Sequence, residues 1–236
     1  MTNFLRLFLT ASLVYFSNIA FANAIPYFRG SSLTPTLLEE PFKINSAERK
    51  KEIEEIIKLQ SDLNEAELTQ ASAEYFMRPE NVIQPTLPNL TRKNYPQTFR
   101  LLDSSEETAQ EAKDVMKNYW KIPRPYKADR RIKKVLATKP ASNNAYPSGH
   151  TARSYTVAYV AGLLFPENRA EFILNARQIT ERRVLIGEHF PSDLSAGRKL
   201  ALMVVGGLIQ NSEFQRDLEA AKEEVKRNSK KHLKAN

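Results

Sequence analysis

The chain has 236 residues, 42% hydrophobic and 26% charged, which is normal for a globular protein and excludes wholesale disorder and collagen-like structure. It has no cysteine, which excludes disulfides, thiolate zinc sites, iron–sulfur clusters and cysteine nucleophiles, and its only histidines are His150, His189 and His232. The net charge is +8 and is concentrated in residues 113–139 and 222–236, a distribution that favours nucleic acids, anionic membranes or small anionic substrates as partners.

The first 24 residues resemble a secretory leader in composition. Arg6 precedes an apolar stretch from about Leu7 to Phe16, and alanines at positions 20, 22 and 24 have the spacing of a cleavage site. A membrane anchor needs roughly 20 uninterrupted apolar residues, and polar residues interrupt this stretch. We therefore predict a signal peptide over residues 1–24 and an exported protein, which is periplasmic if the source is a Gram-negative bacterium.

Residues 25–236 predict a single all-α domain of about six to eight helices. Helix-start residues, prolines and apolar spacings of three and four indicate the following segments: Asn45 to about Gln60, Asn64 to Arg78, Ser104 to just before Pro123, Ser148 to Phe165, Glu167 to about Gly187, Pro191 to Ile209, and Ser212 to about Lys231. Almost no segment alternates with period two, so we expect no sheet. Residues 222–236 form a basic C-terminal tail, expected to be a solvated helix end.

Three short segments carry groups suited to an anion: Lys117 with Arg124 and Pro125, then Pro147-Ser148-Gly149-His150, then Arg183 with His189 and Asp193. Lysine and arginine together can neutralise a phosphate dianion. Ser148 and Gly149 lie where a loop becomes a helix, and the free N–H groups and dipole of a helix start favour an anion. Taken singly, each segment also has a structural explanation as a helix cap, a salt-bridged pair or a group of solvated charges.

His189 and Asp193 are four residues apart at the start of a predicted helix. At that spacing a carboxylate can accept the imidazole N–H and fix the tautomer, so that the other ring nitrogen offers its lone pair. Such an imidazole is an activated nucleophile. His150 is then the candidate that donates a proton to the leaving alkoxide.

Together, Lys117-x6-Arg124-Pro125, Pro147-Ser148-Gly149-His150 and Arg183-x5-His189-x3-Asp193 resemble the three-part signature of the type 2 phosphatidic acid phosphatase and vanadium haloperoxidase superfamily. The leader and the size make the chain most similar to the bacterial class A non-specific acid phosphatases, which implies their helical fold. The resemblance implies hydrolysis of small phosphomonoesters without a metal or other cofactor. It assigns nucleophilic attack to His189, orientation to Asp193 and proton transfer to His150, and it places the phosphoryl oxygens on Lys117, Arg124, Ser148, Gly149 and Arg183.

One position departs from that signature. The family usually has serine before the arginine of the third motif, and this chain has Arg182. Because adjacent residues of a helix do not share a face, we expect Arg182 to point into solvent.

Several alternative functions stay open from the sequence alone. One is a vanadium-dependent haloperoxidase with His189 bound to vanadium, although the chain length favours the phosphatase. Another is a lipid or lipopolysaccharide phosphatase that contacts an anionic membrane through the basic tail. A third is a helical protein that binds anions or nucleic acid without catalysis; we expect no dedicated nucleic-acid partner. The resemblance is compatible with a homo-oligomer and with phosphoryl transfer to another alcohol.

Overall fold

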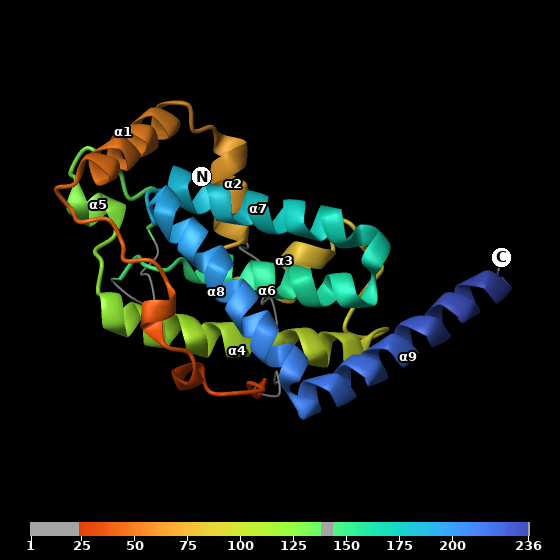
Figure 1. The fold of residues 1–236 in the computed structure, drawn as a ribbon. Helices are drawn as coiled ribbons and strands as arrows, with labels where there is room; N and C mark the ends of the chain where they lie inside the picture. Colours follow the sequence, from red (N-terminus) through yellow and green to blue (C-terminus); the bar gives the residue numbers. More distant parts are fainter. Residues whose placement is uncertain (1–23, 138–143, 236) are drawn as a thin grey trace, which may run out of the picture.

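The computed structural model describes residues 24–137 and 144–235, and in this part of the chain every regular element is a helix (Figure 1). The α-helices are α1 (Ala47–Ser61), α2 (Glu65–Ala73), α3 (Pro79–Ile83), α4 (Pro96–Trp120), α5 (Pro125–Ala128), α6 (Gly149–Leu164), α7 (Arg169–Leu185), α8 (Pro191–Gln210) and α9 (Ser212–Ala235). The all-α prediction is confirmed. The predicted leader lies outside the described residues, apart from Ala24.

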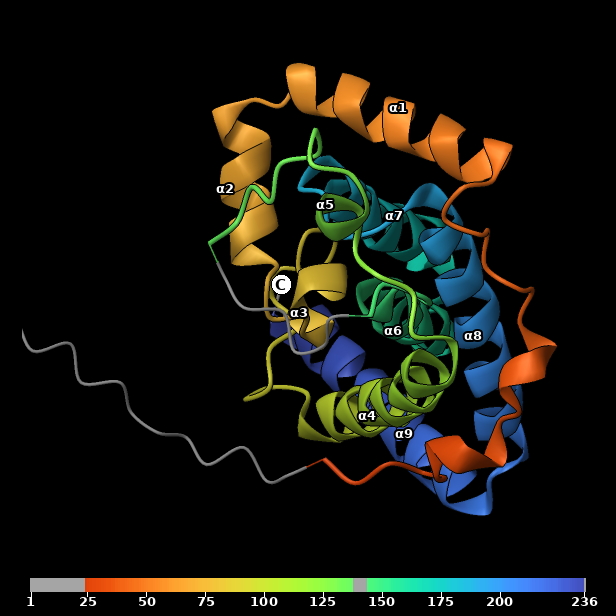
Figure 2. The same cartoon turned by 90° about the vertical axis from the view of Figure 1, so that its left-hand side faces the viewer.

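Helix α6 is the centre of the molecule. Twelve of its 16 residues are buried, and it packs against α4, α7 and α8. Figure 2, which looks along α6, shows these three helices around it. A helix that is apolar on all sides is stable only when other helices cover it, so α6 forms the core and its first turn has a fixed position among its neighbours.

Local sequence signals explain several helix starts. Ser148 caps α6 by accepting the Thr151 amide, and Asn64 forms a capping box with Glu67 at the start of α2. At α1 the cap is Ser46, one residue later than the asparagine we predicted. These caps satisfy backbone N–H groups that have no partner inside their own helix.

The predicted start of α4 at Ser104 is wrong, because this helix begins eight residues earlier, at Pro96. Its first amides are capped by a distant carboxylate: Glu224 of α9 accepts the N–H groups of Gln97 at 3.0 Å and of Thr98 at 2.8 Å. Glu224 is buried. The first part of the basic tail is therefore packed against α4, and the expectation of a simple solvated helix end is wrong for this part.

The described residues contain more helices than the six to eight we predicted, because two short ones lie between predicted segments, in the proline-bearing stretches 79–96 and 123–147. Helices α3 and α5 have five and four residues, and each begins with a proline at its first position, where the missing N–H costs nothing. Helix α2 ends at Ala73, five residues before the predicted end. The seven longer helices correspond to the predicted segments.

Two glycines allow the close contacts on which the site depends. A Cβ on Gly197 would lie 2.8 Å from the Ser148 carbonyl oxygen, so glycine lets α8 approach the first turn of α6. Gly187 has a φ of 76°, and a Cβ there would lie 2.6 Å from the Lys133 carbonyl oxygen. Only glycine adopts this left-handed conformation without strain, and the turn that it makes leads to His189.

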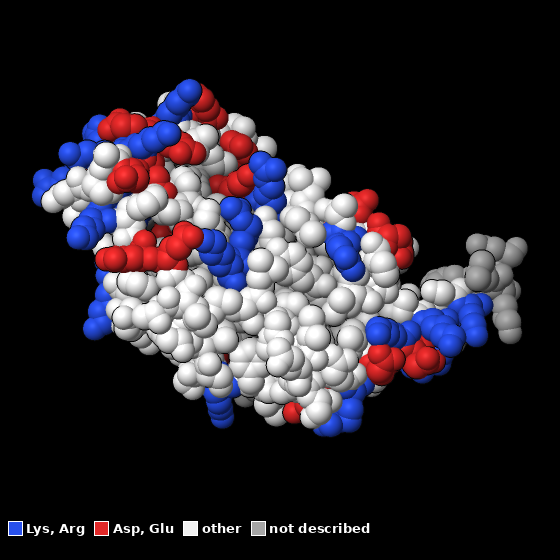
Figure 3. Space-filling model, viewed as in Figure 1, with Lys and Arg blue, Asp and Glu red and all other residues white. Residues whose placement is uncertain are grey.

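Charged side chains are unevenly distributed on the face drawn in Figure 3. They gather over α1 and its neighbours at one end and along α9 at the other, with a broad uncharged face between. Among the described helices, none is both long enough and apolar enough to cross a bilayer.

Candidate active site

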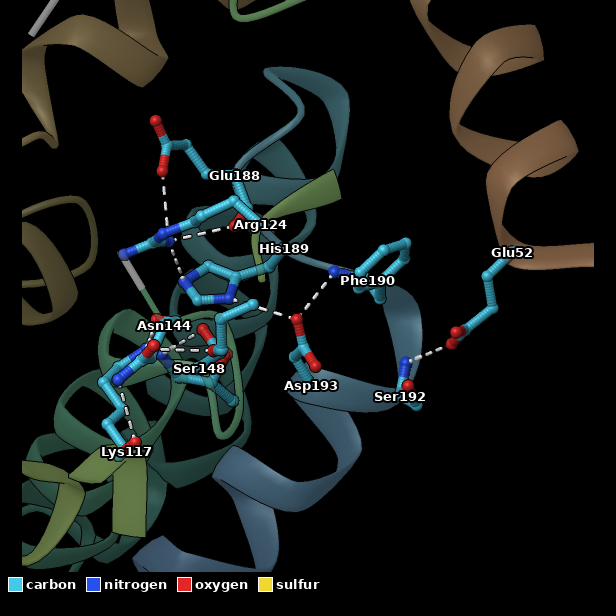
Figure 4. A network of polar contacts seen from close by, with 12 residues as sticks. Glu52, Lys117, Arg124, Asn144, Ser148, Glu188, His189, Phe190, Ser192 and Asp193 are labelled. Atoms are coloured by element: carbon cyan, nitrogen blue, oxygen red, sulfur yellow. Dashed lines mark hydrogen bonds and ion pairs between the residues drawn. The ribbon is translucent and has the colours of Figure 1, made fainter. Parts of the chain in front are cut away.

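The structure brings the predicted site residues together at one end of α6, and Figure 4 shows five of them: Lys117, Arg124, Ser148, His189 and Asp193. They come from the last turn of α4 (Lys117), the start of α5 (Arg124), the start of α6 (Ser148, Gly149, His150), the end of α7 (Arg183), and the start of α8 (His189, Asp193). The positive charges of Arg124, Lys117 and Arg183 all act on His189. Segments that are distant in the sequence therefore share one electrostatic environment.

His189 is held between an arginine and a carboxylate. Its Nε2 lies 3.0 Å from Arg124 Nη1, and its Nδ1 lies 3.4 Å from Asp193 Oδ2. A guanidinium can only donate hydrogen bonds, so Nε2 is the acceptor and Nδ1 carries the proton. This is the tautomer that the four-residue spacing predicts.

Burial controls the protonation of this pair. Loss of hydration and the charges of Arg124 and Lys117 hold the pKa of His189 well below its usual value, so the imidazole is neutral. Burial raises the pKa of Asp193 to about 6, against the opposing effect of the Phe190 amide, which donates to Asp193 Oδ2 at 2.8 Å. The carboxylate is thus ionised only above mildly acidic pH.

Lys117 is buried beside the loop that precedes α6. Its Nζ donates to the carbonyl oxygens of Asn144 at 2.5 Å and Ala145 at 2.9 Å. Burial and the nearby Arg124 charge lower the pKa of Lys117. Among the described residues it has no carboxylate within ion-pairing distance, so an anion that enters the site would be its natural counter-charge.

The first turn of α6 differs in one respect from the prediction. The Ser148 amide donates to the Asp193 carbonyl oxygen at 3.0 Å, and Ser148 Oγ bonds to Thr151. The Ser148 N–H is therefore already used to join α6 to α8. The next two amides, of Gly149 and His150, are the helix-start donors that have no partner inside the helix.

His150 is fixed by the segment that follows α2. Its Nε2 lies 3.2 Å from the Glu74 carbonyl oxygen and 3.1 Å from that of Tyr75. Carbonyl oxygens only accept, so Nε2 carries the proton and Nδ1 is the nitrogen that can exchange a proton with a ligand. Loss of hydration and the charges of Arg183 and Arg153 hold the pKa of His150 well below its usual value.

This shift predicts a pH-dependent contribution to stability. Because the pKa of His150 is lower in the folded state, the unfolded chain binds a proton first as the pH falls below about 6.5, and stability is lost. Glutamine can still donate to the Glu74 carbonyl oxygen but does not titrate. We therefore expect the melting temperature of the wild type, relative to His150→Gln, to fall as the pH is lowered from about 7.5 to about 5. If the melting temperatures of the two proteins change equally with pH over this range, the lowered pKa of His150 is contradicted.

Arg183 is buried, and its guanidinium group has hydrogen-bond partners for only some of its donors. Its Nη2 donates to the Ala71 carbonyl oxygen at 2.7 Å and lies 3.4 Å from Glu74 Oε2, whereas its Nε has no partner among the described residues. Burial lowers the pKa of Arg183 to about 10, so it stays charged at neutral pH. A buried cation with a free donor is suited to an anionic ligand.

The expectation for Arg182 is wrong. Its side chain is only 17% exposed and forms a two-pronged pair with the carboxylate of Glu74, with Nε 2.8 Å from Oε2. Arg182 and Arg183 leave α7 on different faces, as helix geometry requires. Glu74, at the end of α2, nevertheless lies where it reaches both guanidinium groups.

Three further acidic or basic residues support the site and were not predicted. Glu188 binds Arg124 through its carbonyl oxygen at 2.9 Å and through its carboxylate at 3.0 Å. Glu52 of α1 accepts the Ser192 amide at 2.6 Å, at the start of α8 (Figure 4). Arg49 stacks on the Phe190 ring at 3.7 Å. The position of Glu188, directly before His189, is the only sequence signal that could have indicated any of them.

Comparison with known proteins gives one family match, in the part of the chain that carries the site. Residues 108–217 match the model of the PAP2 superfamily. A non-specific acid phosphatase of Providencia stuartii is 31% identical over 138 residues, which is 57% of this chain and 56% of that protein. One from Salmonella typhimurium is 34% identical over 91 residues, or 39% and 36% of the two chains. A lipid A 1-phosphatase of Rhizobium etli is 39% identical over 57 residues, or 24% and 25%.

The chain thus spans about half, or less, of the curated relatives that it matches. The matched segment nevertheless contains all eight predicted site residues and four helices that surround them, α4 in part and α6, α7 and α8 in full. The helical fold and the geometry at the end of α6 agree with this match, and we conclude that residues 108–217 are similar to the PAP2 superfamily.

Proposed function

We propose that the protein is a metal-independent acid phosphatase that hydrolyses small phosphate monoesters through a phosphohistidine. The observation that carries the proposal is the state of His189: a neutral imidazole whose Nε2 lone pair faces Arg124 and whose Nδ1–H faces Asp193. The similarity to acid phosphatases supports the same reaction.

In the first step, His189 Nε2 attacks phosphorus and the bond to the ester oxygen breaks. The guanidinium of Arg124, which bonds to Nε2 in the free protein, would turn to a phosphoryl oxygen when substrate binds. Lys117, Arg183 and the amides of Gly149 and His150 would hold the other oxygens. Fixed cations and helix-start amides stabilise the charge of the transition state, which is the main task in phosphoryl transfer.

The leaving alkoxide needs a proton, and we assign its transfer to Nδ1 of His150, since Nε2 is held by the two carbonyl oxygens. The phosphate dianion favours the protonated imidazole, which opposes the low pKa of His150 in the free protein. In the second step, the same nitrogen takes a proton from water, the water oxygen attacks phosphorus, and the bond to His189 breaks to release inorganic phosphate.

The test is hydrolysis of p-nitrophenyl phosphate by residues 25–236 at pH values from about 4 to about 9 with EDTA present. We expect turnover that survives EDTA, peaks at about pH 5 to 6.5, where histidine changes charge, and is inhibited by vanadate, which resembles the transition state. Activity that needs zinc or magnesium and rises steadily into the alkaline range would refute the proposal. Halide oxidation by a vanadate-loaded sample, without phosphatase turnover, would favour a haloperoxidase.

A second candidate substrate is a phosphate group on a membrane lipid. It is supported by the similarity to a lipid A 1-phosphatase and by the lysines and arginines along α9 (Figure 3). Co-sedimentation with anionic vesicles that Lys226→Gln with Lys230→Gln abolishes, together with release of phosphate from the vesicle lipid, would favour it. The proposed leader, residues 1–24, would place either activity outside the cytoplasm.

A further inference from the structure

Glu74 is a buried carboxylate between two guanidinium groups. Its side chain is 3% exposed, and those of Arg182 and Arg183 are 17% and 1% exposed. Arg182 contacts both carboxylate oxygens, whereas Arg183 reaches only Oε2, at 3.4 Å. Gln70 Nε2 donates to Oε1 at 3.0 Å. The stronger ion pair of Glu74 is thus with Arg182.

The position of Arg183 does not depend on this carboxylate alone. The shorter contact of Arg183 is with the Ala71 carbonyl oxygen, at 2.7 Å. That neutral acceptor fixes the guanidinium and leaves its charge in place, and Nε remains without a partner. Glu74 by contrast carries a negative charge within reach of the group that we assign to the phosphoryl oxygens.

Without a second cation, Glu74 would neutralise Arg183 and repel a phosphate dianion. At short range in a partly buried site, one unit charge changes the interaction with an anion strongly. Arg182 supplies the second cation: the three side chains together carry a net charge of +1, and the two-pronged pair takes up the acceptor capacity of the carboxylate. Serine at position 182 could not supply this charge.

We propose that Arg182 and Glu74 form a charge-compensating pair, in which Arg182 neutralises the buried carboxylate so that Arg183 keeps its charge for the phosphoryl group. The inference rests on the proposed function of this site. It makes Arg182 a positioning residue of the reaction, acting through Glu74 on Arg183. It also gives a physical reason for an arginine at the position where the resembling phosphatases usually have serine.

The experiment is a double-mutant cycle read by the affinity for inorganic phosphate, measured by calorimetry, and by kcat/KM for p-nitrophenyl phosphate. We expect Arg182→Ser to raise the Kd of phosphate about tenfold and to lower kcat/KM by a similar factor. A tenfold change is at the low end of the range measured when a hydrogen bond to a charged group is lost. Adding Glu74→Gln should restore both to within about threefold of the wild type. Glutamine keeps an oxygen for Arg183, so Glu74→Gln alone should not weaken phosphate binding.

Arg177→Ser is the matched control, because Arg177 also lies on α7 and pairs with a carboxylate, Glu181, but on the exposed surface. It should leave both readouts unchanged. Arg182→Gln is the second test if the serine variant melts below the assay temperature. An Arg182 variant that binds phosphate as the wild type does, or a double variant no better than Arg182→Ser, overturns the inference.

The two proposals fail in different ways. A wild type that binds phosphate, loses affinity in Arg182→Ser and hydrolyses no phosphoester would overturn the proposed function and leave the charge-compensating pair intact. If the wild type hydrolyses p-nitrophenyl phosphate but Arg182→Ser changes neither readout, the charge-compensating pair is overturned and the proposed function is left intact. A wild type that does not bind phosphate overturns both.

Discussion

Replacing His189 by alanine is expected to lower kcat/KM for p-nitrophenyl phosphate by about four orders of magnitude or more, since the variant has no nucleophile to form the phosphoenzyme. Arg124 and Lys117 stay in place, so phosphate binding should persist while turnover is lost. The measurement is initial rates at pH values from about 5 to about 7 with EDTA present, together with the Kd of inorganic phosphate.

The control for this variant is His232→Ala, which removes the third histidine of the chain. It should retain full activity. Because His189 is buried and bonded to Arg124, the melting temperature of His189→Ala must also be measured, so that unfolding is not taken for loss of chemistry. Turnover at the wild-type rate in folded His189→Ala would refute both the nucleophile and the mechanism built on it.

Replacing Asp193 by asparagine should lower kcat by about 10²- to 10⁴-fold, the range expected when a histidine loses the carboxylate that orients it and stabilises its positive charge. Asparagine keeps an oxygen that can accept the Phe190 amide, so the first turn of α8 should survive. The variant therefore separates the charge of Asp193 from its structural role as a helix cap.

The pH profile gives a second readout of Asp193. Burial raises the pKa of this carboxyl to about 6 in the free protein, so on the acid side of its optimum the wild type should lose activity as the carboxylate takes up a proton. The residual activity of Asp193→Asn should lack that decline. The matched control is Asp62→Asn, at an exposed helix end, which should keep the wild-type profile. An identical acid decline in Asp193→Asn would assign it to another group.

Much of the fold could be predicted because the signals for it are local. Asn64, Ser148 and Pro191 lie at helix starts, and their effect is exerted within one turn. The start of α4 could not be predicted in this way. Its cap is Glu224, more than 120 residues later, and no pattern near Pro96 contains that information. A cap supplied by another helix becomes visible only when the packing is known.

The site also combines residues that local motifs indicate with residues that only packing brings there. The candidate residues lie in motifs whose spacing reflects chemistry, and the structure brings them together. Glu74 and Glu52 lie in the N-terminal helices and reach the site only through packing. The expectation for Arg182 failed for a related reason: helix geometry correctly placed it on a different face from Arg183, but no local pattern indicates that α2 covers that face.

The docking of α1 has a consequence for how the protein would lose activity. This helix lies outside the family segment, yet two of its residues hold the peptide that leads from His189 into α8: Glu52 accepts the Ser192 amide, and Arg49, its ion-pair partner, stacks on the Phe190 ring. Release of α1 alone would free that peptide while the packing around α6 persisted. Under heat or denaturant, loss of the proposed activity would then precede global unfolding, and the half-life of that activity would be set by the release of α1.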